Sequence, residues 1–119
     1  MEDMRKIRIS PGEYYHLYNR GVGKQDIFFD KRDWVRFLFL VLHFQSLDPY
    51  PNIGRQVTHY VKHSVFNLSE KASARILNGR RVILNGFCLM PNHFHLLVYE
   101  KEEGGIARYM QRTQNAYTK

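Results

Sequence analysis

The sequence predicts an α+β fold in which an antiparallel sheet carries its helices on one face. Two runs rich in β-forming residues, 81–90 and 93–99, are separated only by the turn pair Pro91-Asn92, which is typical of an antiparallel hairpin. A third run, 13–19, is rich in aromatic residues and comes first along the chain. A segment with helical spacing of apolar residues follows the first strand, and another follows the hairpin.

The first strand is expected over 13–19, and the sequence from Arg20 to Gly23 ends it, because its two glycines allow a tight turn. Asp30 is expected to cap a helix that begins at Lys31. The apolar residues of this helix extend beyond one stripe and include Trp34, Val35, Phe37, Leu38, Phe39, Leu40, Val41 and Leu42. Such a helix is either deeply buried or shared with a partner subunit, so a homodimer is one expectation.

Residues 46–81 carry the weakest pattern and are expected to form a variable insert. Pro49 and Pro51 predict an irregular stretch, since proline restricts itself and the residue before it. Two short helices are expected over 56–66 and 69–77, with Ser69 capping the second.

The last part of the chain completes the predicted order β-α-insert-β-β-α. Gly86 interrupts the first strand of the hairpin and predicts a bulge. After a break at 104–105, a helix is expected over 106–119, with an apolar face made of Ile106, Tyr109, Met110, Thr113 and Tyr117. This order is that of a ferredoxin-like fold without its last strand. Residues 1–119 are expected to form a single domain.

The chain of 119 residues is basic, with a formal net charge of +7. Residues 60–119 hold nine basic and four acidic side chains, so most of the excess lies there. Such an excess suits either a phosphate backbone or a solvated basic surface. The single cysteine, Cys88, excludes an internal disulfide and is expected to be a buried strand residue. No apolar run is long enough to span a bilayer, so a cytoplasmic protein without a membrane partner is predicted.

His93 and His95 are the residues that point most directly to chemistry. In a strand, side chains two positions apart project from the same face, while Phe94 points to the other. At a rise of about 3.3 Å per residue their Cα atoms lie about 7 Å apart, close enough for both imidazoles to bind one metal ion. Two solvent-exposed histidines without a metal would show the same pattern.

Other chemistries of paired histidines fit the sequence less well. A zincin requires His-Glu-x-x-His on a helix, which is absent. A histidine-triad hydrolase requires a third alternating histidine, but Leu97 stands in that place. Two-histidine phosphoesterases require two separate His-x-Thr/Ser motifs, and the chain has none.

Residues 86–98 read Gly-Phe-Cys-Leu-Met-Pro-Asn-His-Phe-His-Leu-Leu-Val. This run closely resembles the signature of the single-tyrosine HUH transposases, which include the insertion-sequence-200-like and REP-associated tyrosine transposases. Residues 14–22 resemble the first strand and turn of that family, 30–38 the start of its first helix, and 106–117 its second helix. The resemblance covers nearly the whole chain outside residues 46–81.

The resemblance implies DNA transposition by a dimeric enzyme of ferredoxin-like fold. Such enzymes cleave and rejoin single-stranded DNA, often beside a hairpin, through a phosphotyrosine intermediate. His93 and His95 would bind a divalent ion, Mg²⁺ or Mn²⁺, which polarises the scissile phosphate. The family's nucleophilic tyrosine and last strand lie beyond its second helix, and are therefore expected beyond Lys119. Tyr117 is the catalytic candidate within the chain, although its position matches a packing tyrosine of that helix.

Four further residues are candidates for DNA contact: Asn19, Arg20, Arg108 and Arg112. A turn with a solvated arginine and a solvated helix face would explain them equally well. His16 is expected to share the sheet surface of the histidine pair or to be an ordinary strand histidine.

Three functions remain open from the sequence. The first is an HUH transposase domain, and the second is a remnant that binds DNA hairpins or dimerises without cutting. The third is a small metal-dependent phosphoesterase that uses water.

Overall fold

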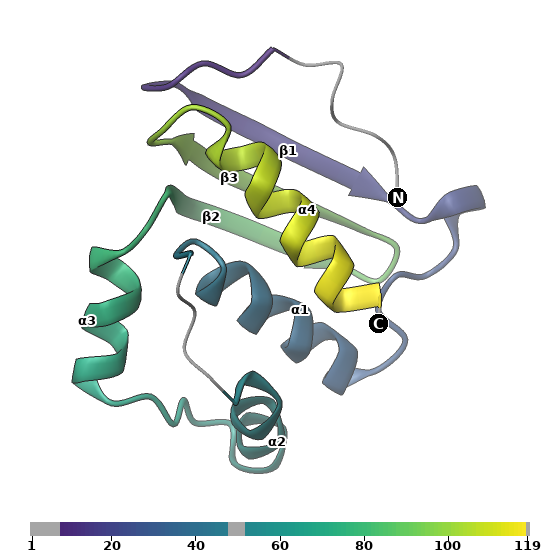
Figure 1. The fold of residues 1–119 in the computed structure, drawn as a ribbon. Coiled ribbons are helices and arrows are strands. Elements are labelled where there is room, and N and C mark those ends of the chain that lie inside the picture. The colour runs from purple at the N-terminus through teal and green to yellow at the C-terminus, as the bar shows by residue number, and fades with distance from the viewer. Residues whose placement is uncertain (1–7, 48–51, 119) are drawn as a thin grey trace.

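The computed structural model describes residues 8–47 and 52–118 of the chain (Figure 1). Its elements are, in order, β1 (Tyr14–Arg20), the 3₁₀ helix η1 (Val22–Lys24), α1 (Lys31–His43), α2 (Ile53–His63), α3 (Glu70–Asn78), β2 (Val82–Met90), β3 (His93–Glu100) and α4 (Gly105–Thr118). The predicted α+β class and the order of strands and helices are confirmed. None of the helices among these residues has the length and apolar character needed to cross a bilayer.

The three strands form one antiparallel sheet in the order β1-β3-β2. The pairing of β2 with β3 shifts its register between Leu84 and Gly86, so the predicted bulge is confirmed. α1 and α4 lie side by side on one face of the sheet (Figure 1). Phe94, Leu96 and Val98 project from β3 toward these helices and are fully buried. The described residues leave the other face of the sheet uncovered.

The wide apolar surface of α1 is buried inside this chain. Asp30 caps the helix as predicted, since its side chain accepts a hydrogen bond of 2.9 Å from the Asp33 N–H. One side of the helix packs on the sheet, where the Phe37 ring lies 4.8 Å from that of Phe94 between centroids. Its other sides contact α2 and α4. The intrachain packing therefore accounts for the apolar surface from which a homodimer was expected.

The insert contains the two predicted short helices, but the first is shifted by three residues. α2 begins at Ile53 rather than at position 56, and it ends at His63. Asn52 and Ser64 flank it at φ angles of 66° and 56°, a left-handed conformation that cannot continue a right-handed helix. Ser69 caps α3 as predicted, accepting a hydrogen bond from the Ala72 N–H. The irregular stretch that was predicted from Pro49 and Pro51 lies mostly outside the described residues.

His43, near the end of α1, makes folding sensitive to pH. Desolvation lowers its pKa below 6.5, and its hydrogen bond to Gln56 opposes this shift only in part. The folded protein thus binds fewer protons at His43 than the unfolded chain. The free energy of unfolding is therefore expected to decrease as the pH falls below about 6.5. Above that pH the contribution of His43 to this free energy should not change. Urea unfolding at pH values on either side of this point measures the effect.

The variant His43→Leu supplies the control for this prediction. It removes the titrating ring from its contact with Phe39, whose ring centroid lies 5.9 Å away. Because the pKa of His95 is also lowered, the variant should lose part of the acid sensitivity rather than all of it. An unchanged pH profile in His43→Leu would contradict the assignment.

Candidate metal centre on the open sheet face

Aromatic and imidazole rings of β1 and β3 line the uncovered face of the sheet. The antiparallel register sets their neighbours: Tyr14 lies opposite Tyr99, His16 opposite Leu97, Tyr18 opposite His95, and Arg20 opposite His93. The rings of His16 and His95 are stacked with 4.9 Å between centroids. His16 therefore shares the surface of the histidine pair, which confirms the first of the two expectations for this residue.

His93 and His95 lie beside each other on this face, with 5.3 Å between their ring centroids and planes 89° apart. Phe94, between them in sequence, is buried on the opposite face. Two imidazoles that bind one cation at about 2.1 Å each bring their centroids to roughly 5 Å apart. The spacing of the pair is therefore compatible with a shared metal ion.

Asn92 selects the tautomer of the His93 ring. The Asn92 side-chain nitrogen donates to the Lys24 carbonyl oxygen at 3.4 Å, which turns its Oδ1 toward His93 Nδ1 at 2.7 Å. Oδ1 can only accept, so Nδ1 of the ring carries the hydrogen. The neutral ring then has its lone pair at Nε2, the atom that a metal ligand needs.

His95 is held by its stacked neighbour. His16 Nε2 and His95 Nδ1 are 2.7 Å apart in a hydrogen bond that leaves His95 Nε2 available. The pKa of His95 is lowered, first by desolvation and then by the nearby His16 and His93. All three causes favour the neutral ring, which is the form that binds metal.

Tyr18 and Arg20 extend the cluster with a phenol and a guanidinium. The Arg20 Nε–H donates to the Tyr18 hydroxyl at 2.7 Å, and the Tyr18 ring lies 4.8 Å from the ring of His95. Arg20, one of the candidates for DNA contact, is exposed at the end of β1. The sequence alone does not single out Tyr18 as a neighbour of the histidines. Alternation along β1 places it on the face of Arg20, but its contact with His95 depends on the strand register.

Asn19 does not belong to this surface. Its side chain is completely buried on the helix-covered face, and its Oδ1 accepts a hydrogen bond of 3.0 Å from the Arg20 N–H. The side chain of Asn19 is therefore not accessible for the DNA contact that was predicted for it. Neighbouring residues of a strand project to opposite faces, so Asn19 and Arg20 could not both face the same ligand.

Arg108 and Arg112 lie on α4 and do not join the histidine cluster. The Arg108 guanidinium is 3.1 Å from Glu102 in an ion pair. Arg112 donates to the Ser46 carbonyl oxygen and lies over the Phe44 ring, 4.7 Å from its centroid. Arg112 thus ties α4 to the end of α1, and neither arginine reaches the open face.

Tyr117 lies on the wrong side of the sheet for catalysis with the histidines. Its ring packs edge-on against Phe28 and Phe37, and its hydroxyl donates to the Ile27 carbonyl oxygen at 2.7 Å. Desolvation, with smaller electrostatic contributions, raises its pKa to about 12, so the phenol stays protonated. The structure therefore places Tyr117 in a packing position, as its alternative expected, and away from the histidines that a nucleophile would have to reach.

Cys88 lies opposite His95 on the open face and is exposed, so the expectation that it is buried is also wrong. β2 is an edge strand, and its side chains on this face meet no helix.

Within residues 8–47 and 52–118, no group of three or more His, Cys, Asp or Glu side chains is placed to hold a metal ion. The pair of imidazoles would therefore bind a metal as two ligands, with the remaining positions open to water or substrate.

In comparisons with known proteins, no family model, no curated protein and no solved structure matches the chain.

Proposed function

We propose that the protein is an HUH transposase domain of ferredoxin-like fold, which acts on single-stranded DNA beside a hairpin with a divalent metal ion at His93 and His95. The observation that carries this proposal is the pair of imidazoles on one face of β3, 5.3 Å apart, with the His93 lone pair set at Nε2 by Asn92. A homodimer belongs to the same proposal through the resemblance, and a cytoplasmic location through the single cysteine, which fits a reducing compartment.

The donor set favours one cation over the other. Imidazole nitrogen suits Mn²⁺ better than Mg²⁺, which prefers oxygen ligands and near-complete octahedral geometry. When bound, the ion would supply Lewis-acid polarisation of a phosphate oxygen. His93 and His95 would hold the ion through Nε2, since both rings are fixed by hydrogen bonds on their Nδ1 atoms.

The neighbours of the pair suit an unpaired DNA strand. Arg20 presents its remaining guanidinium hydrogens next to the imidazoles and can donate to a phosphate oxygen. Tyr14 is 62% exposed, and its ring lies 5.0 Å from that of Tyr99 at the other end of β1. Exposed aromatic rings beside cationic groups bind single strands by stacking on bases.

A second function, a binding remnant that grips hairpin DNA without cutting, is favoured by the position of Tyr117. A phenol on the covered face cannot attack a phosphate held at the histidines. Among the described residues, Tyr18 is the tyrosine in ring contact with the pair. Covalent attachment would therefore map either to Tyr18 or to a tyrosine outside the described residues.

The test uses a hairpin oligonucleotide with an unpaired 5′ strand. Wild type is expected to bind Mn²⁺, seen by electron paramagnetic resonance, and to bind the oligonucleotide more tightly when Mn²⁺ is present. His93→Ala and His95→Ala should each lose this metal-dependent gain. Tyr117→Phe is the control, because it removes only the hydrogen bond to Ile27 and should keep the gain. Mn²⁺ binding that survives both histidine substitutions would overturn the proposal.

The products distinguish the three functions. A protein–DNA adduct that resists denaturation, located by peptide mapping, supports the transposase. Metal-dependent binding without an adduct supports the remnant. Hydrolysis of small nucleotides without an adduct supports the water-using phosphoesterase.

A further inference from the structure

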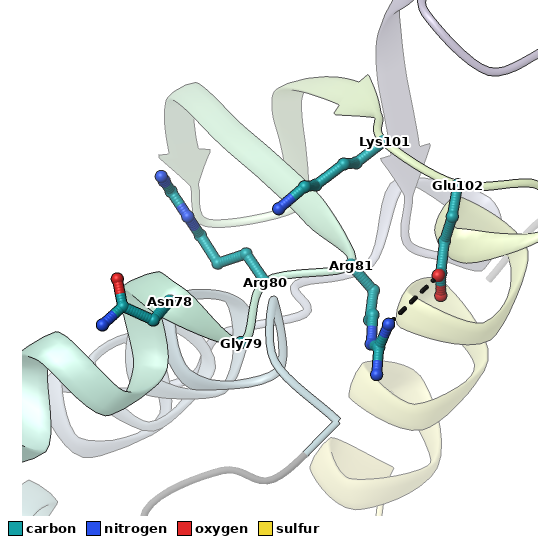
Figure 2. Close-up of a pocket in the computed structure, with 6 residues that line it drawn as sticks. All are labelled: Asn78, Gly79, Arg80, Arg81, Lys101 and Glu102. Carbon is teal, nitrogen blue, oxygen red and sulfur yellow. Dashed lines mark hydrogen bonds and ion pairs between the residues drawn. The ribbon is translucent and has the colours of Figure 1, made fainter.

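A basic hollow of about 280 Å³ lies at the end of the sheet opposite the histidine cluster (Figure 2). It forms where α3 ends, β2 begins and the chain leaves β3. Its lining residues are Asn78, Gly79, Arg80, Arg81, Lys101 and Glu102.

Positive charge exceeds negative charge around this hollow. Glu102 is the acidic residue of the lining, and its carboxylate is shared by two guanidinium groups, those of Arg81 at 3.3 Å and Arg108 at 3.1 Å. One carboxylate cannot neutralise both. Arg80 and Lys101 add two further cations, neither of which has an acidic partner in the part of the chain that the structure describes.

Arg80 and Lys101 are positioned for an external anion. The Arg80 Nε–H donates to the Leu77 carbonyl oxygen at 3.2 Å, which holds the stem of the side chain and leaves its terminal nitrogens free to donate elsewhere. Figure 2 shows both side chains pointing away from Glu102. Two cations that line one open hollow are complementary to phosphates of one backbone.

We infer that this hollow is a second DNA site, at which Arg80 and Lys101 bind backbone phosphates of the duplex stem of the hairpin. The inference rests on the proposed function, because the unpaired strand of the same DNA would lie at the histidines. β3 has 8 residues and runs from one site to the other, so at about 3.3 Å per residue the two sites are about 26 Å apart. A duplex rises about 3.4 Å per base pair, so the stem needs about eight base pairs to reach the hollow.

This length requirement provides the test. Two hairpins share one unpaired strand and carry stems of about four and about twelve base pairs, shorter and longer than the span between the sites. The double variant Arg80→Ser/Lys101→Ser should bind the long-stem hairpin about tenfold more weakly at low salt, and lower the slope of log Kd against log salt by about 2. Its affinity for the short-stem hairpin should equal that of wild type.

The matched control is Arg55→Ser/Lys62→Ser, which removes two exposed cations from α2 and should leave both affinities unchanged. The inference would be overturned if Arg80→Ser/Lys101→Ser lost the same affinity for both hairpins, or none for either. It would also be overturned if the double variant lost as much affinity for anionic lipid vesicles, without DNA, as for the long-stem hairpin. The readout needs no metal. If Mn²⁺ does not tighten DNA binding by wild type, but the double variant still loses affinity only for the long-stem hairpin, the proposed metal chemistry is rejected and the stem site is not.

Discussion

Replacement of Glu100 by Ala is expected to lower the free energy of unfolding by about 2–5 kcal/mol. The Glu100 side chain is 1% exposed, and its two carboxylate oxygens accept hydrogen bonds from the backbone N–H groups of Ile106 at 2.7 Å and Gly104 at 3.1 Å. These N–H groups belong to the start of α4, where a helix has no internal acceptors for them. Alanine would leave the buried Ile106 N–H and the part-buried Gly104 N–H without this acceptor, at about 1–3 kcal/mol for a buried donor and less for a part-buried one.

Urea unfolding of two further variants makes this prediction specific. Glu100→Gln keeps one carbonyl oxygen as acceptor and should lose less stability than Glu100→Ala. Glu103→Ala removes an exposed carboxylate of the same loop and should change stability by less than about 0.5 kcal/mol. A loss below about 1 kcal/mol in Glu100→Ala would show that the carboxylate does not hold the start of α4.

Replacement of Asn92 by Ala is expected to weaken Mn²⁺ binding about 10–100-fold. Asn92 touches no metal in the proposed site and acts through His93, whose Nδ1–H it accepts at 2.7 Å. Without this acceptor, the ring can rotate and can carry its hydrogen on Nε2, the atom that must bind the ion. Titration of Mn²⁺ by electron paramagnetic resonance measures the change.

Two substitutions separate positioning from a loss of folding. Asn92→Asp retains an oxygen that accepts from His93 Nδ1, and should bind Mn²⁺ at least as well as wild type. Asn85→Ala removes an amide from β2 that donates to the Ile83 carbonyl oxygen, away from the histidines, and should not change the affinity. Equal Mn²⁺ affinity in Asn92→Ala and wild type would contradict the role of Asn92, even if His93→Ala abolished binding.

Local signals in the sequence were sufficient for the elements of the fold. Asp30 and Ser69 mark helix starts through a side chain that bonds to the backbone three residues away, so the signal and its partner lie in one turn. Gly86 marks the bulge for a similarly local reason. The alternation of β3 also placed His93 and His95 on one face, because the direction of side chains in a strand repeats every two residues. The shifted start of α2 shows the limit of such signals, since it depends on the backbone conformation of Asn52.

The sequence by itself thus determined the order and approximate place of the strands and helices, although not the bounds of α2, and that two imidazoles project together from one strand. Only the tertiary structure decided what lies next to them: His16 and Tyr18 on the open face, Asn19 and Tyr117 on the covered face, and the wide surface of α1 inside the chain. The physical reason is that periodicity is a property of a segment and its own backbone. Register and packing are set by the burial of several distant segments at once, and no single segment encodes them.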